Sequence, residues 1–301
     1  RRVLQRRPAL HRLHDALIAE FDEAPAVERL YLAHFGLERA PFSITPDPRF
    51  FYPGAGRAEL LQAIEYSVQH QEGIVVVTGE VGSGKTMLCR KLLDSLPQGL
   101  ESIYLANPSL RRREIVAALL RDLDGRQRPD PLDALQQVLI ARYMAGRRVM
   151  LVVDEAHVMP HESLEQIRLL SNLETGRHKL LQIVLFGQPE LDEVLLDPRM
   201  RALRDRIVER FAMRALDRGL VGDYLEHRMR CAGLVGPSPF GPGAVRELWE
   251  LAGGLVRRIN LLADKALLSA FVRRHERVDR RDVERARLEL DGDASPRRRV
   301  A

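Results

Sequence analysis

Short apolar stretches alternate with amphipathic ones through the first two thirds of the chain. The apolar stretches are rich in Val, Ile and Leu, which predicts buried strands at about residues 75–78, 102–106, 148–153, 181–186 and 207–213. Apolar residues at helical spacing predict helices at about 10–21, 57–70, 87–93, 111–123 and 132–145. This alternation predicts an α/β fold, in which a parallel sheet is covered by helices and binds its ligand at the carboxyl ends of the strands.

The strand pattern stops near residue 217, and only helical spacing follows. Helices are expected at about 223–231, 243–252, 256–273 and 279–290, which predicts a small all-helical lid domain. We therefore expect the following division: an N-terminal extension (1–29) with a helical stretch, an α/β nucleotide-binding domain (30–215), the lid domain (216–290) and a flexible basic tail (291–301).

Residues 41–53 combine four prolines with several aromatic residues. Proline interrupts regular secondary structure, whereas large aromatic side chains favour burial. The segment is therefore expected to form an extended strap across the domain.

The first strand runs directly into a complete G-x-x-x-x-G-K-[ST] sequence, and a helical pattern follows it. In this context the motif predicts a phosphate loop, whose backbone N–H groups and helix N-terminus bind phosphates. Lys85 is expected between the β- and γ-phosphates, and the Thr86 hydroxyl on Mg²⁺. The predicted nucleotide-binding residues of this stretch are Gly79, Glu80, Val81, Gly82, Ser83, Gly84, Lys85, Thr86 and Met87.

Two carboxylates, Asp154 and Glu155, follow the apolar strand at 148–153. A metal-bound triphosphate needs a carboxylate near the metal, and the attacking water needs a base. We expect Asp154 to serve Mg²⁺ and Glu155 to polarise the water. Together with the phosphate loop, the pair predicts a nucleotide hydrolase.

Four further polar residues are weaker candidates. Gln188 follows the strand at 181–186 and is expected near the γ-phosphate, although a plain turn residue before a proline is an equal alternative. Arg206 and Arg210 flank the start of the last strand and either extend beyond their own subunit or are ordinary surface arginines. Arg257 lies just after a glycine pair at a helix N-terminus, where a cation needs a partner or solvent.

These motifs together resemble the ExeA-type secretion ATPases of the AAA+ family, and within that group the MSHA-pilus biogenesis ATPases. The resemblance covers about residues 31–290, and the proline-rich aromatic segment makes it more specific than the nucleotide motifs alone. The matching stretches are residues 31–51, 79–86, 153–156, 171–175, 179–182 and 187–191.

The resemblance implies an ATPase that helps to assemble a type II secretion or type IV pilus machine. It implies that Lys85 and Thr86 bind phosphate and Mg²⁺, and that Asp154 and Glu155 form the Walker B motif. Gln188 would be sensor 1 and Arg257 sensor 2. Arg210 falls where related proteins keep the arginine finger that a neighbouring subunit inserts, with Arg206 as the second candidate.

The chain departs from the family pattern at two positions. Val256 stands where the family usually has a proline before the sensor 2 arginine. His157 replaces the glutamine that usually follows the Asp-Glu-Ala sequence, so the polar contact of that glutamine has no direct counterpart.

Composition narrows the choice of partners. The formal net charge is +5, but seven arginines lie in residues 1–7 and 297–299, and the rest of the chain has 40 basic against 42 acidic residues. This balance argues against nucleic acid as a partner. Two distant cysteines predict neither a disulfide framework nor a metal site, which suits a reducing compartment.

No apolar run approaches the ~20 residues of a membrane-spanning helix, so no membrane insertion is expected. The sequence thus predicts a cytoplasmic protein that is recruited to the inner face of the membrane by a membrane-bound pilus or secretion assembly protein, and that forms nucleotide-dependent homo-oligomers. Two alternatives stay open: a DNA-binding ATPase of the transposition-regulator type, and a nucleotide-gated scaffold with little turnover.

Overall fold

A computed structural model describes residues 31–70, 73–106, 109–125, 131–175 and 178–292. Its main sheet has five parallel strands in the order β2-β3-β6-β1-β7. The three central strands are almost entirely buried, as expected for a sheet covered on both faces. All five predicted strands are confirmed: β1 (Ile74–Gly79), β2 (Leu100–Leu105), β3 (Arg148–Val153), β6 (Leu181–Gly187) and β7 (Ile207–Met213).

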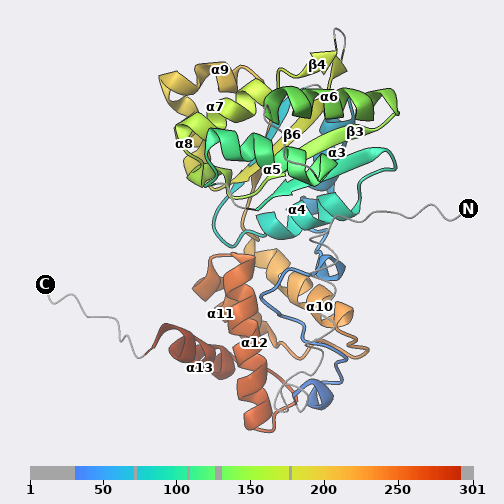
Figure 1. Cartoon of the computed structure of the whole chain (residues 1–301). Coiled ribbons are helices and arrows are strands. Elements are labelled where there is room, and N and C mark those ends of the chain that lie inside the picture. Colours follow the sequence, from blue (N-terminus) through green and yellow to red (C-terminus); the bar gives the residue numbers. More distant parts are fainter. Residues whose placement is uncertain (1–30, 71–72, 107–108, 126–130, 176–177, 293–301) are drawn as a thin grey trace, which may run out of the picture.

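Helices cover both faces of this sheet (Figure 1). The helices α3 (Arg57–His70) and α4 (Lys85–Asp94) bury their apolar faces against alternate residues of the strands, among them Val77 and Phe186. The intervening residues, such as Val76 and Leu185, face the other helical layer. That layer contains α5 (Arg112–Asp124), α6 (Pro131–Met144), α7 (His161–Leu170), α8 (Glu190–Leu196) and α9 (Arg201–Arg204).

The sequence pattern predicted α3 to α6 but not α7, α8 or α9. The missed helix α7 does carry an apolar spacing of three, in Leu164, Ile167 and Leu170, and all three side chains are fully buried. A short antiparallel pair, β4 (Glu174–Thr175) and β5 (His178–Lys179), was also not predicted.

The last part of the described chain is helical, as predicted, and lies beside the edge of the α/β layers (Figure 1). It has an apolar core of its own, in which Leu225, Leu248 and Leu262 are fully buried. Its helices are α10 (Val221–Cys231), α11 (Pro242–Ala252), α12 (Val256–Val272) and α13 (Arg280–Asp291). The predicted helix at 10–21, and all of the basic tail beyond Gly292, lie outside the described residues.

The proline-rich strap contains one turn of 3-10 helix, η1 (Pro48–Phe50), and is otherwise irregular. Its aromatic residues are buried as expected, but against the C-terminal helices rather than the sheet. Phe42 is 1% exposed and meets Phe240 edge to face at 5.7 Å. Residues 31–50, which the predicted division assigns to the α/β domain, thus pack into the core of the helical region (Figure 1).

Arg228 of α10 fastens the strap to the helical region. It is 4% exposed, its Nε donates to the Pro41 carbonyl at 2.6 Å, and its guanidinium lies 4.6 Å from the centre of the Phe50 ring. Burial lowers the pKa of Arg228. Because the buried charge is offset by one hydrogen bond and by the ring face, its position depends on the strap.

Replacing Arg228 with Met keeps most of the side-chain volume but leaves the Pro41 carbonyl without this donor. We expect the free energy of unfolding to fall by about 2 to 4 kcal/mol, from the lost hydrogen bond and cation–π contact. The matched control is Arg230→Met on the same helix, where an exposed pair with Glu226 is lost at a cost of about 0.5 kcal/mol or less. Urea unfolding measures both variants, and equal losses would contradict the role assigned to Arg228.

Candidate nucleotide site

The phosphate-loop sequence connects β1 to α4 at the carboxyl edge of the sheet. Gly82 and Gly84 have φ values of 79° and 105°, a region open mainly to glycine, and α4 begins directly at Lys85. The Lys85 ammonium donates to the carbonyls of Gly79 and Glu80 at 2.6 and 3.0 Å, which folds the side chain back over the loop. Burial lowers the pKa of Lys85, while nearby carboxylates oppose that shift. The loop thus holds a cation beside a helix N-terminus, an arrangement suited to an anion.

Asp154 lies at the adjacent strand end, immediately after β3. It is 4% exposed and accepts hydrogen bonds from the Tyr104 hydroxyl at 3.2 Å and from the Thr86 hydroxyl. Burial raises the pKa of Asp154, and the hydrogen bond from the Glu155 N–H opposes the rise. A hydroxyl paired with a carboxylate next to a phosphate loop is a donor set that fits Mg²⁺, so Thr86 and Asp154 suit the metal role expected of them.

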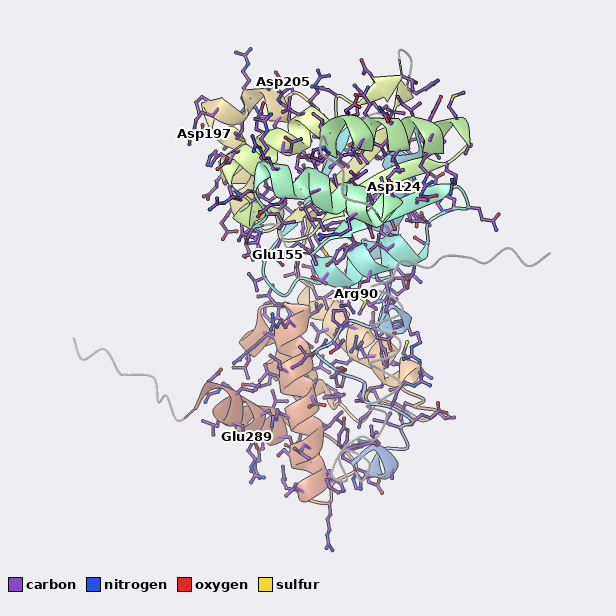
Figure 2. All side chains as sticks on the ribbon, in the orientation of Figure 1. Arg90, Asp124, Glu155, Asp197, Asp205 and Glu289 are labelled. Carbon is purple, nitrogen blue, oxygen red and sulfur yellow. The ribbon has the colours of Figure 1, made fainter. Side chains whose placement is uncertain are left out.

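Glu155 and Gln188 also meet at this edge. Glu155 has the left-handed backbone conformation, with φ 53° and ψ 37°, and its Oε2 accepts from the Gln188 side-chain amide at 3.2 Å. Its side chain is 43% exposed and lies on the side of the α/β layers nearest to the helical region (Figure 2). The carboxylate expected to act as base is therefore open to water and already contacts the residue expected to sense the γ-phosphate.

The helical region reaches the phosphate loop through the start of α12. The Arg257 N–H donates to the Gly82 carbonyl at 3.1 Å, and a Cβ on Gly82 would lie 2.9 Å from the Arg257 Cβ. The glycine pair before α12 allows this approach, because Gly254 packs against the Leu216 backbone, where a side chain would have no room. Arg257 thus stands beside the loop, as expected.

A cavity of about 310 Å³ lies between the phosphate loop, the strap and the helical region. Lys85, Thr86, Met87, Glu155, Gln188 and Arg257 all contribute to its wall. The remaining wall includes residues that the sequence analysis did not assign: Ile44, Phe50, Phe51 and Tyr52 of the strap, together with Arg57, Tyr224, Arg228 and Asn260.

Arg57 was missed although its position carries a signal. It occupies the buried face of α3 in register with Leu61, Ile64 and Val68, where an apolar residue is expected. Its Nη2 donates to the Ser83 carbonyl at 3.3 Å, and its Nη1 has no hydrogen-bond partner among the described residues. Burial lowers the pKa of Arg57. A charged residue on the apolar stripe of a predicted helix therefore marks a contact to the phosphate loop.

The two candidate finger arginines do not line the cavity. Arg206 precedes β7 at the opposite edge of the sheet, where its carbonyl accepts from the Ile74 N–H. Arg210 lies within β7 and pairs with Asp192 of α8 at 3.2 Å, with 41% of its side chain exposed. The structure therefore leaves both arginines outside the site of their own subunit.

Comparison with known proteins adds to this geometry. Residues 68–195 match the family model described as an AAA domain. The chain is also 40% identical over 269 residues to "General secretion pathway protein A" from Aeromonas hydrophila, a match covering 87% of this chain and 49% of the relative. The chain is an AAA+ P-loop protein similar to the ExeA-type secretion proteins. It spans about half the length of that relative.

Solved structures agree on the AAA+ P-loop fold. The ORC2 protein of Aeropyrum pernix superimposes with a TM-score of 0.63 at 15% identity, covering 86% of this chain and 72% of that one. Cdc6p from Pyrobaculum aerophilum gives 0.63 at 16% identity, covering 81% and 71%. The RuvB motor of Thermotoga maritima gives 0.54 at 15%, covering 79% and 69%. At these identities the likeness of the AAA+ chain to them concerns the fold alone.

The contact between Gly82 and Arg257 is open to a direct test. Gly82→Ala adds both left-handed strain and a Cβ clash with α12, which should distort the phosphate loop and lower ATP affinity about tenfold or more. The matched control is Gly56→Ala, which has a similar φ of 73° but open space around the new Cβ. Calorimetric titration with ATP measures both, and equal affinities in the two variants would contradict the contact's role.

Proposed function

We propose that the chain binds ATP with Mg²⁺ and hydrolyses it at the carboxyl edge of the sheet. The observation that carries this proposal is the meeting of three features at that edge: the Lys85 ammonium on its loop, the Thr86–Asp154 pair and the Glu155–Gln188 pair. The match to an AAA domain supports nucleotide binding by the same stretch.

Each residue then has a distinct task. The loop N–H groups and Lys85 bind the phosphates, while Thr86 and Asp154 hold Mg²⁺, which neutralises charge that develops on the phosphate oxygens during transfer. Glu155 orients a water and accepts its proton as the oxygen attacks the γ-phosphorus and the bond to the β-phosphate oxygen breaks. Gln188 fixes the Glu155 carboxylate until the γ-phosphate competes for its amide.

The strap and the helical region complete the site on the side away from the metal. Phe50, Phe51 and Tyr224 supply apolar and aromatic surface for a nucleobase. Tyr224 is held in place, because its hydroxyl donates to Asn260 Oδ1 at 2.6 Å and its ring meets Tyr52 edge to face at 5.5 Å. Arg257, beside the loop, then links the phosphates to the position of α12 as a sensor 2 residue.

We further propose that active molecules are homo-oligomers in which Arg210, or else Arg206, enters the site of a neighbouring subunit. An arginine supplied in this way contributes about 10³ to 10⁵ in rate. In a single subunit Arg210 is paired with Asp192, so this ion pair must open before the guanidinium can reach a neighbour.

For the wider role we propose assembly of a type II secretion or MSHA-like type IV pilus machine, through a membrane-bound partner that recruits the chain to the inner face of the cytoplasmic membrane. The 40% identity to a general secretion pathway protein supports this role. Within the described residues, no helix is long and apolar enough to cross a membrane.

The competing DNA-binding role has less support. One similar structure is an ORC1 protein in complex with DNA, but at 19% identity the likeness extends to the fold only. Outside residues 1–7 and 297–299 the chain has no excess of positive charge, which is the usual basis of DNA affinity.

Glu155→Gln tests the hydrolytic proposal. The amide keeps the shape and hydrogen bonding of the side chain but cannot accept the proton of water, so ATP binding should persist while turnover falls about a hundredfold or more. Glu193→Gln, on the exposed surface of α8, is the control and should leave turnover unchanged. Undiminished hydrolysis in the Glu155 variant would place the base elsewhere. Turnover in the unaltered chain no higher than in this variant would favour the nucleotide-gated scaffold.

A sedimentation assay separates the secretion or pilus role from the DNA role. With ATP at near-physiological salt, the chain should co-sediment with membranes from cells that carry a type IV pilus or type II secretion machine, and not with membranes from cells lacking it. Duplex DNA should leave the ATPase rate unchanged, because the few phosphate contacts are lost to competing counterions. Strong stimulation by DNA without membrane recruitment would overturn the assembly role.

A further inference from the structure

His157 is the residue at which the chain departs from its family beside the predicted base, and the structure gives it a definite place. The left-handed conformation of Glu155 turns the chain from β3 into a single turn of 3-10 helix, η2 (Ala156–Val158). Its turn is closed by a hydrogen bond from the Val158 N–H to the Glu155 carbonyl at 3.1 Å. This turn directs His157 back to the site, where 11% of its side chain is exposed.

One ring nitrogen of His157 faces two groups of the site. The Gln188 backbone N–H donates to Nδ1 at 3.4 Å, and the same Nδ1 lies 3.5 Å from Glu155 Oε2. Since the Gln188 side-chain amide also donates to Glu155 Oε2, the three residues form a closed cluster. The imidazole thus touches both the carboxylate expected to activate water and the backbone of the residue expected to sense phosphate.

Nδ1 cannot serve both groups at once. A bare Nδ1 accepts the Gln188 N–H and offers Glu155 only a lone pair, whereas a protonated Nδ1 donates to Glu155 and leaves the Gln188 N–H without this acceptor. In the second case the imidazolium forms a charged hydrogen bond that occupies the carboxylate oxygen. The two arrangements exclude each other, and one proton decides between them.

The charged surroundings of His157 are few. On the site side they are Asp154, Glu155 and Lys85, whose ammonium is acted on by both carboxylates. Of the elements packed against η2, β6 has no charged residue, and α8 carries Glu190, Asp192 and Glu193. Asp192 pairs with Arg210, while Glu190 and Glu193 are exposed, so Glu155 is the carboxylate that the ring contacts.

We propose that His157 is a positioning residue whose Nδ1 proton switches Glu155 between a free and an occupied state. With Nδ1 bare, His157 holds the Gln188 backbone and Glu155 is available to the attacking water. With Nδ1 protonated, the imidazolium takes the carboxylate oxygen and hydrolysis stops. This inference rests on the proposed role of Glu155 as the base.

Histidine ring NMR tests the switch without turnover. In nucleotide-free protein labelled with ¹⁵N-histidine, and with the signal assigned by its loss in His157→Asn, the ring should carry its proton on Nε2 at about pH 8 and gain one on Nδ1 on acidification. Glu155→Gln should lower the midpoint of this titration, because the imidazolium loses its carboxylate partner. A proton on Nδ1 at about pH 8, or an unchanged midpoint in the variant, would overturn the proposal.

Turnover supplies the second readout. From about pH 8 down to about pH 5.5, kcat of the unaltered chain should fall as His157 charges, while His157→Asn, whose amide oxygen can replace Nδ1 as acceptor but does not titrate, should lose this fall and keep KM within about twofold. The matched control is His161→Asn, since His161 also faces a carboxylate, Asp197 at 3.5 Å, but outside the site. An acid fall that persists in His157→Asn, or that His161→Asn also removes, would contradict the switch.

The Glu155→Gln variant keeps the two proposals apart. Normal turnover in that variant would reject Glu155 as the base, whatever the NMR titration shows. Loss of turnover together with an unaltered pH profile in His157→Asn would leave the hydrolytic proposal standing and reject the switch alone.

Discussion

The site depends on the parallel pairing of β1 with its neighbours. Thr78 of β1 lies opposite Gly187 of β6 on one side and Ala212 of β7 on the other, and Val153 of β3 lies opposite Leu185. Because parallel strands end at the same edge, this register brings the phosphate loop, the Asp154–Glu155 pair and Gln188 together although up to a hundred residues separate them in sequence. The chemistry proposed here needs little beyond this alignment.

The same register explains why so much was predictable. The β-branched runs that mark buried strands also fix which residues come next, so the positions of Lys85, Asp154, Glu155 and Gln188 follow from strand ends alone. The short helices α8 and α9 were missed because seven and four residues give too few turns for a helical period to stand out. Side-chain contacts such as that of His157 with Gln188 depend on the left-handed turn at Glu155, which no pattern of residue types specifies.

The aromatic strap was the main element that sequence alone could place only in part. Its composition predicts burial, but nothing in residues 41–53 indicates which core receives them. The answer depends on Arg228 and Phe240, nearly two hundred residues later. Arg57 and Arg228 are both buried cations on the cavity wall, one fixed to the phosphate loop and the other to the strap. Together with Arg257, they connect the nucleotide cavity to every element that surrounds it.

The strap also constrains the order in which the chain can fold. The contacts from Arg228 to Pro41 and from Tyr31 to Asp264 span 187 and 233 residues, so the aromatic segment has no core to join until the last helices exist. During synthesis the α/β layers between them can form first, since the strands and their covering helices are complete by Met213. Phe42 and Phe50 then remain without their native cover while the ribosome completes α10 to α13. The early residues of this chain are thus among the last to be buried, and the interval before α12 is made is the period in which a nascent chain is most exposed to aggregation.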